Sequence, residues 1–373
     1  MTRGPARPIW LAAPSRYAGL GRTPGRLVAA ALALLILASL ASLWSAAPPP
    51  KSSEPATQAD DQRDVVLYTN IVAAVRHGDG YYTSAARALR GGDYPLRPFF
   101  TFRLPTLAMV QGHLPEPVIV GLLFALVVAV VLAWAARLRT ALTGRAPTVI
   151  ALALLAGGLI AFVQADLWPF HEIWAGLLLA LSLALRRPGR WAEAAAIGLI
   201  AALVRETAGL YLFLMMVLAW REGYRREALG WLAAGLALAA ALAAHAYGVA
   251  QVTNPVDPAS PGWAGLLGPG FFVTAIKAST ALAILPLAAA APLIALSLFG
   301  WAAWRDPTGL RAAVTFFAYA VLLAVFARPD TFYWGLMIAP AFLVGLIFVP
   351  DALRDLVGRR VDKPRITVTR VTR

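Results

Sequence analysis

Ionisable residues in this chain gather between long apolar runs, and the longest polar stretch is Pro48–Pro117. Within that stretch Asp64 and Tyr68 are four residues apart, so a helix would present both side chains on one face. A polar stretch beside a membrane keeps charged groups in water while a lipid head group stays at the bilayer surface. The chemistry that this arrangement favours is therefore a reaction on a lipid-linked substrate.

A second group of polar residues lies in a short loop between two apolar runs. Asp166, His171 and Glu172 occur there beside Trp168 and Trp174. If this loop faces the same compartment as the long polar stretch, its side chains would line a pocket, with Asp166 or Glu172 binding a metal ion or sugar hydroxyls. The simpler interpretation is that Glu172 complements the positive end of a helix.

Two arginines stand close to acidic residues at the ends of apolar runs. A charge near the bilayer centre costs about 2.5–3.5 kcal/mol. The neighbours Arg205 and Glu206 therefore either offset this cost as an ion pair or leave Arg205 to hold a lipid phosphate. Arg328 and Asp330 pose the same choice, because arginine binds phosphate oxygens bidentately but also forms interfacial ion pairs.

The composition is that of an all-α protein with several transmembrane helices. Of 373 residues, 60% are hydrophobic and 14% are charged, with a mean hydropathy of +0.68. Cysteine is absent, which excludes disulfides and thiol catalysis, and the four histidines show no metal-ligand spacing. The net charge of +14 does not indicate nucleic acid, because the arginines punctuate the ends of apolar runs.

We expect about ten membrane-spanning helices. The apolar runs are 27–46, 117–136, 147–163, 171–185, 191–204, 207–220, 228–249, 272–304, 312–327 and 331–349. The runs 191–204 and 207–220 are short, which predicts a tight helical hairpin with Arg205 and Glu206 at its tip. The run 272–304 is too long for one straight helix, and its prolines Pro286 and Pro292 predict a kink or a break.

Arginine clusters follow every second run, whereas the loops Gln164–Phe170 and Ala250–Phe271 contain no Lys or Arg. This alternation predicts a bacterial-type inner membrane protein with both termini in the cytoplasm. The expected parts are a disordered basic arm (1–26), one membrane domain (27–350) with its first outer loop (47–117), and a basic cytoplasmic tail (351–373). Ser45-Ala46-Ala47 would suit a signal peptidase, but the long basic arm and the length of the first run favour an uncleaved anchor.

The first outer loop is expected to contain two interfacial helices. One begins at Asp64 and stops at Gly78, and the other is Tyr81–Arg90, stopped by Gly91. Tyr81 and Tyr82 would lie at head-group depth, as interfacial anchors or as platforms for a sugar ring.

This order of features resembles the GT-C superfamily of polyprenyl-phosphate-sugar-dependent glycosyltransferases. The resemblance rests on a first transmembrane helix followed by Asp64-x3-Tyr68 and then by Gly80-Tyr81-Tyr82. The segment Arg328–Pro340, which contains Tyr333, is similar to the pattern in late helices of that superfamily. Members often carry an Asp-Glu pair at the start of the loop and a soluble C-terminal domain. This chain has Asp60-Asp61 and a basic tail instead.

The resemblance implies an inverting transfer of a sugar from a polyprenyl phosphate to an acceptor at the outer face of the membrane. A carboxylate at the start of the loop, Asp64 or Asp61, would deprotonate the acceptor hydroxyl, and arginines or a divalent metal would stabilise the leaving phosphate. Without the resemblance, Asp64 would be interpreted as a solvated side chain or as the N-cap of its helix. The candidate substrate-binding residues are Tyr68, Tyr81, Tyr82, Arg103, Asp166, His171, Glu172, Arg205, Glu206, Arg328 and Tyr333.

Two other functions are compatible with the sequence. A transporter or flippase of lipid-linked glycans would favour charges at mid-span and inverted repeats, whereas the charges here collect at outer ends and no repeat is evident. A non-catalytic protein of cell-envelope assembly remains a third class. A glycan polymerase or ligase would place its large loop late in the chain, and here that loop is early.

Overall fold

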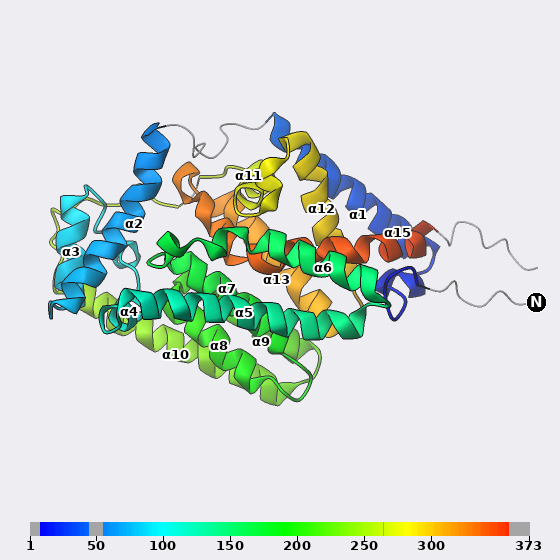
Figure 1. The fold of residues 1–373 in the computed structure, drawn as a ribbon, viewed down its shortest axis with the longest axis horizontal. Coiled ribbons are helices and arrows are strands. Elements are labelled where there is room, and N and C mark those ends of the chain that lie inside the picture. Colours follow the sequence, from blue (N-terminus) through cyan, green and yellow to red (C-terminus); the bar gives the residue numbers. More distant parts are fainter. Residues whose placement is uncertain (1–7, 45–54, 264, 358–373) are drawn as a thin grey trace, which may run out of the picture.

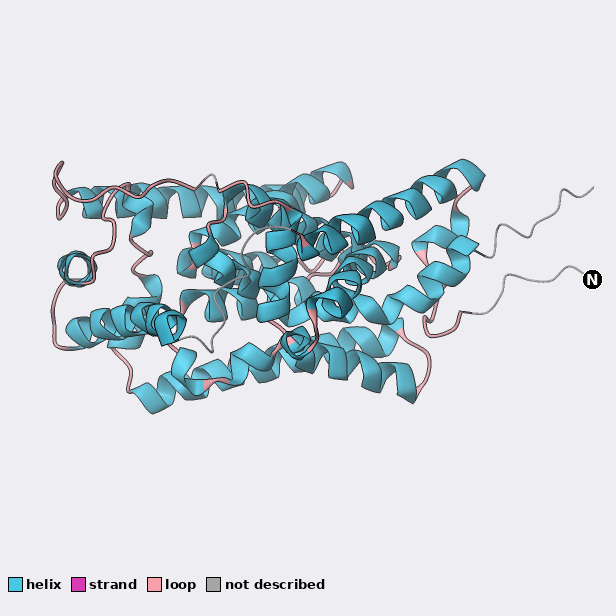
Figure 2. Cartoon of the chain, turned by 90° about the horizontal axis from the view of Figure 1, so that it is seen from above, coloured by secondary structure: helices cyan, strands magenta, loops and turns pink. Residues whose placement is uncertain are grey.

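The computed structural model describes residues 8–44, 55–263 and 265–357, and of residues 55–63 it describes only the backbone. Throughout these ranges the chain is helical, and they contain no strand apart from isolated bridges (Figure 2). The all-helical fold predicted from the composition is confirmed.

The helices are connected by short turns and by 3₁₀ segments. The α-helices are α1 (Arg22–Leu40), α2 (Pro55–Arg76), α3 (Tyr81–Gly91), α4 (Thr106–Gly112), α5 (Glu116–Ala141), α6 (Arg145–Gly158), α7 (His171–Leu185), α8 (Ala192–Val204), α9 (Gly209–Arg221), α10 (Arg225–Ala250), α11 (Pro269–Ala278), α12 (Leu287–Ala303), α13 (Pro307–Phe326), α14 (Ala339–Phe342) and α15 (Val349–Val357). The 3₁₀ segments are η1 (Arg16–Gly19), η2 (Ala41–Leu43), η3 (Phe99–Thr101), η4 (Ile160–Val163), η5 (Ala165–Leu167), η6 (Glu206–Ala208), η7 (Ala281–Ile284), η8 (Pro329–Met337) and η9 (Leu343–Phe348).

Four of these helical segments are long and apolar enough to cross a membrane: α1 with η2, α5, α10 and α13. The bent pair Pro329–Met337 and Ala339–Val357, with 58° between its halves, would add a fifth. Helices α6, α7, α8 and α12 are apolar but have only 10–17 residues, fewer than the roughly 20 that one straight crossing needs. The chain therefore has several helices that could span a membrane, and the expected number of about ten is not confirmed.

Two of the predicted breaks are confirmed, at Pro286 and at Arg205, whereas Pro292 lies inside α12. Between α11 and α12 the chain passes through η7, and Pro286 stands at the N-cap of α12. Arg205 is extended (φ −139°, ψ 109°) and ends α8 before η6 and α9 begin. Helices α8 and α9 lie against each other, since Gly198 packs against Tyr211 and Leu212.

The molecule is elongated, and its two ends are built differently (Figure 1). Helices α2, α3 and α4 occupy one end, and α15 and the N-terminal segment occupy the other. At the second end the buried carboxylate of Asp351 accepts hydrogen bonds from the backbone N–H groups of residues 9–11, at 2.6–2.9 Å. We expected residues 1–26 to be a disordered arm. Their described part is instead folded onto α15. These N–H groups, together with the guanidinium of Arg354 at 2.9 Å, satisfy a fully buried carboxylate.

Within the stretch expected to form the first outer loop, the chain makes helices at the two predicted places and a third, α4. Helix α2 begins at Pro55, nine residues before the predicted start at Asp64. Gly78 joins α2 to α3 with φ at +95°, a conformation that glycine adopts without strain. Helix α3 ends at Gly91, in agreement with the predicted stop. The position of these helices at a membrane surface stays a prediction.

The chain that follows α3 is tied to a loop that comes much later in the sequence. The backbone N–H groups of Leu96 and Arg97 donate to the carbonyl oxygen of Pro258, at 2.9 and 3.3 Å. In return Ser260 donates its N–H to the carbonyl of Arg97, at 2.7 Å. These bonds hold the loop 251–268 beside residues 92–103.

Candidate functional site

A cavity of about 750 Å³ lies between α2, the segment 92–103, η5, the end of α11 and η8. It is large enough for a small-molecule ligand, since binding sites commonly measure about 300–1,000 Å³. Of the residues proposed from the sequence, it brings together Asp64, Tyr68, Tyr81, Arg103, Asp166, Arg205, Arg328 and Tyr333. Asp166 is exposed at its edge.

Asp64 is half-buried in the wall of this cavity. Its carboxylate accepts a hydrogen bond from the hydroxyl of Tyr94 at 2.7 Å. Burial raises the pKa of Asp64, and the hydrogen bond from Tyr94 and the charge of Arg103 oppose that rise. The N-cap interpretation is wrong, because α2 begins at Pro55 and Asp64 lies well inside it.

Tyr68, one turn further along α2, lines the same cavity and holds Arg103 in place. The Nε of Arg103 donates to the hydroxyl of Tyr68 at 3.0 Å. Burial raises the pKa of Tyr68 to about 12, so its hydroxyl is neutral and keeps its own hydrogen to donate. The hydroxyl of Tyr81 donates to the backbone carbonyl of Arg103 at 2.5 Å, which fixes the start of that side chain.

Arg103 belongs to a cluster of two arginines and two glutamates that we call the cavity cluster: Arg103, Glu172, Arg205 and Glu206. In it Arg205 is paired with both carboxylates, because its Nε donates to Glu172 at 2.5 Å and its Nη1 contacts Glu206. Arg103 reaches the same carboxylates only at 3.7 and 4.0 Å, beyond hydrogen-bonding distance. Both terminal nitrogens of Arg103 are therefore available as cationic donors in the cavity.

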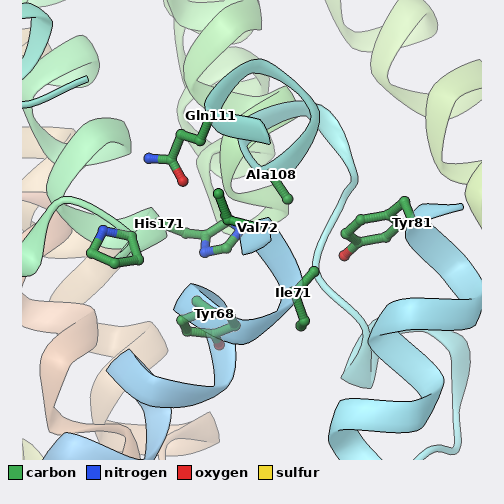
Figure 3. A pocket seen from close by; sticks show the side chains of 8 residues that line it. Tyr68, Ile71, Val72, Tyr81, Ala108, Gln111 and His171 are labelled. Atoms are coloured by element: carbon green, nitrogen blue, oxygen red, sulfur yellow. The ribbon is translucent and has the colours of Figure 1, made fainter. Parts of the chain in front are cut away.

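His171 lies behind Tyr68 in a second, very small pocket of about 10 Å³ (Figure 3). The imidazole contacts the ring of Tyr68 edge to face, with 4.8 Å between the centroids. Both ring nitrogens and the Oε1 of Gln111 are buried without a hydrogen-bond partner among the described residues. His171 therefore packs against the ring of Tyr68 and does not line the large cavity.

Arg328 and Asp330 form a bidentate ion pair in the wall of the large cavity. The Nε and Nη2 of Arg328 donate to the carboxylate at 3.1 and 2.7 Å, and the Nη1 donates to the hydroxyl of Ser260 at 3.3 Å. The guanidinium also lies over the ring of Trp263, at 5.8 Å. The ion-pair interpretation of Arg328 is thus the one that the geometry supports.

The remaining predicted residues lie outside the cavity or outside the described side chains. Tyr82 is half-buried against α10, with its hydroxyl 3.3 Å from the Nδ1 of His245. Glu172 and Glu206 touch the cavity only through their arginines, and the side chains of Asp60 and Asp61 lie outside the described residues. Sequence reasoning missed Tyr94, Ser260 and Trp263. Nothing in their local sequence indicates that they meet Asp64 or Arg328.

Among the described residues no three His, Cys, Asp or Glu side chains are grouped so as to hold a metal ion. We therefore derive no step through a metal ion. Comparisons with protein families, with curated proteins and with solved structures found no match to this chain.

Proposed function

We propose that this protein is a membrane glycosyltransferase that moves a sugar from a polyprenyl-phosphate donor to an acceptor hydroxyl, with inversion at the anomeric carbon. The observation that supports it best is the presence of a carboxylate, Asp64, and a guanidinium with unused donors, Arg103, in one cavity of about 750 Å³. A base and an anion-binding group are the two components that such a transfer requires.

In the proposed reaction Asp64 accepts the proton of the acceptor hydroxyl. The hydroxyl oxygen attacks the anomeric carbon and forms the new glycosidic bond as the bond from that carbon to the phosphate oxygen breaks. The phosphate leaves with the bonding electrons, and its charge is stabilised by the terminal N–H groups of Arg103 and by the O–H of Tyr68. The raised pKa of Asp64 makes it a stronger base than an exposed aspartate.

Arg103 suits the phosphate better than the other two arginines of the cavity. Arg205 already donates to two glutamates, and Arg328 already donates to Asp330 and Ser260. Binding phosphate at either would first require breaking a charge-assisted pair. Arg103 needs no such exchange, because only its Nε is used.

The reaction is proposed at the outer face of a bacterial-type inner membrane. In support of this orientation, the arginine-rich turns contact one another. Arg137 donates to the carbonyl oxygen of Ala184 at 2.7 Å, and Arg186 and Arg311 both pair with Glu222, at 3.7 and 2.7 Å. Reporter fusions after Arg139, Arg187, Arg226 and Arg305 are expected to report cytoplasm, and fusions near Asp93, Trp168 and Pro258 the outside. Swapped signals at two of these positions would contradict the proposed orientation.

The direct test of the function is Asp64→Asn. Asparagine keeps the shape of the side chain and still accepts the hydrogen bond from Tyr94, but it cannot take up a proton. We expect the variant to insert and fold normally while sugar transfer from a polyprenyl-phosphate donor falls by about 10²–10⁴-fold, the usual contribution of a positioned base.

Asp60→Asn and Asp61→Asn are the matched controls, since they change neighbouring acidic residues of the same helix. If Asp61→Asn loses activity and Asp64→Asn does not, the base is Asp61. Wild-type transfer rates in all three variants would refute the proposed catalytic role of these carboxylates.

A further inference from the structure

The part of the cavity around Arg328 is more exposed to solvent than the part around Arg103. We define the mouth subsite as Phe100, Ser260, Trp263, Arg328 and Asp330, all of which line the cavity. The side chain of Arg328 is 24% exposed and that of Asp330 is 64% exposed, whereas that of Arg103 is 14% exposed. The mouth subsite is therefore the more open part of the same cavity.

The ion pair of the mouth subsite carries no net charge, and its guanidinium is already paired. A phosphate would have to displace Asp330 from Arg328, and it would be repelled by that exposed carboxylate. The pair nevertheless offers strong hydrogen bonding to a neutral ligand. Each carboxylate oxygen of Asp330 has a further lone pair, and hydroxyl groups are the donors that such an acceptor binds best.

The rest of the mouth subsite is aromatic. Phe100 is 37% exposed although it lines the cavity, and its ring lies 4.6 Å from that of Trp263. The electron-rich face of an aromatic ring packs well against the polarised C–H groups on one side of a sugar ring. An aromatic surface beside a carboxylate is thus suited to a ligand with one apolar face and hydroxyl groups at its edge.

The mouth subsite is also held firmly and lies near the proposed base. The loop that contributes Ser260 and Trp263 is fixed to α3 by the bidentate pair of Arg90 with Asp257, at 3.2 and 2.8 Å. The charge of Asp330 is near enough to contribute to raising the pKa of Asp64. A ligand held in the mouth subsite can therefore extend a hydroxyl group toward Asp64 within the same cavity.

From this arrangement we propose that the mouth subsite binds the acceptor, and that the acceptor is a neutral carbohydrate. The proposal rests on the proposed function, with the donor phosphate at Arg103 and the acceptor sugar between Phe100 and Asp330. A peptide hydroxyl or a phosphorylated lipid as acceptor is the competing outcome.

Binding can be measured without turnover in the full-length Asp64→Asn protein in detergent micelles. The probes are neutral hexose and pentose trisaccharides, a serine- and threonine-rich peptide and a hexose 6-phosphate, each followed by saturation-transfer NMR. We expect at least one neutral trisaccharide to bind, with an affinity that changes little between low and high salt because no charge is neutralised. If no trisaccharide binds, or if only the peptide or the phosphate binds, the proposal is overturned.

Two further substitutions locate the binding in the mouth subsite. Asp330→Asn should weaken trisaccharide binding by about tenfold or more, since a hydrogen bond to a charged carboxylate is stronger than one to a neutral amide. It should also let the hexose 6-phosphate bind, because the charge of Arg328 is then unpaired. Phe100→Leu should weaken the binding of the trisaccharide, whereas Phe100→Trp, which keeps an aromatic ring, should bind it as the parent protein does.

The matched control is Asp79→Asn. It removes an exposed carboxylate that pairs with Arg87 at 3.0 Å and does not line the cavity. Unchanged trisaccharide binding in Asp330→Asn and Phe100→Leu would overturn the assignment of the mouth subsite. These experiments separate the two proposals. If Asp64 is not the base, trisaccharide binding persists, whereas if the mouth subsite is wrong, Asp64→Asn still abolishes transfer.

Discussion

Two clusters with the same composition, two arginines and two glutamates, occupy different regions of this protein. The cavity cluster lies beside the large cavity, and the second, which we call the end cluster, consists of Arg186, Glu222, Glu227 and Arg311. In the end cluster Arg186 binds Glu227 bidentately at 2.8 and 2.7 Å, and Arg311 binds Glu222 at 2.9 and 2.7 Å. All four carboxylate oxygens there accept a hydrogen bond.

The cavity cluster is less completely paired. Glu172 and Glu206 each keep one buried oxygen without a partner among the described residues, and the terminal nitrogens of Arg103 stay beyond hydrogen-bonding distance of both. In the end cluster every carboxylate oxygen is paired, and the atoms left without a partner among the described residues are two buried nitrogens, the Nη1 of Arg186 and the Nε of Arg311. None of its members lines the large cavity. Equal charge composition therefore does not mean equal role. Complete pairing joins helices, and incomplete pairing beside a cavity leaves donors for a ligand.

The largest expected effect comes from breaking the end cluster with Glu227→Ala. The substitution leaves Arg186 buried without its bidentate partner, and removing one member of a buried ion pair costs about 3–5 kcal/mol. Denaturant unfolding in detergent should show this loss, while the transfer rate per folded molecule stays unchanged. The control is the exposed Glu193→Ala, expected within about 0.5 kcal/mol of wild type. Normal stability with lost transfer would mean that the end cluster, too, is functional.

The next effect concerns the arginine whose terminal nitrogens are unused. Arg103→Lys keeps the positive charge but loses the planar pair of N–H groups and the bond to Tyr68. We expect the transfer rate to fall by about 10²-fold, the order found when one donor to a developing anion is removed. Stability should change little. Arg87→Lys, at an exposed ion pair, is the control. A wild-type transfer rate in Arg103→Lys would contradict the proposed binding of the phosphate by this residue.

The smallest effect is a pH dependence of stability at Asp64. Burial raises the pKa of this group above its value in the unfolded chain, about 3.9, so the folded protein holds the proton more tightly. As the pH rises from the unfolded pKa through the folded pKa, the stability contributed by the neutral form is lost. Asp64→Asn should therefore be more stable than wild type at pH 7 and equal to it below about pH 4.

Transfer activity should show the opposite trend, because a base works only when deprotonated. The activity of the wild type is expected to rise with pH through a pKa above that of an ordinary aspartate. Equal unfolding curves for the two proteins across the whole pH range would show that Asp64 carries no such shift.

The class of the protein and much of its local structure could be predicted from the amino-acid sequence alone. Its hydropathy predicted helices long enough to cross a membrane, Pro286 marked a break, and Gly78 marked the junction of α2 and α3. The spacing of Asp64 and Tyr68 placed both on one face of α2, where both line the cavity. These features follow from helical periodicity and from backbone preferences of single residues, and neither depends on distant parts of the chain.

Only the tertiary structure decided which charged groups are paired and which are available. The sequence singled out Arg205 and Arg328 as candidates for binding phosphate and gave Arg103 only as one of the substrate-binding residues. The fold pairs Arg205 with two glutamates and leaves the terminal nitrogens of Arg103 without a hydrogen bond. It likewise brings Tyr94 to Asp64 and the loop of Ser260 and Trp263 to Arg328. These partners are 30 to 68 residues apart in the chain. Their contacts arise from the packing of whole helices and from the hydrogen bonds between loops, which no local pattern encodes.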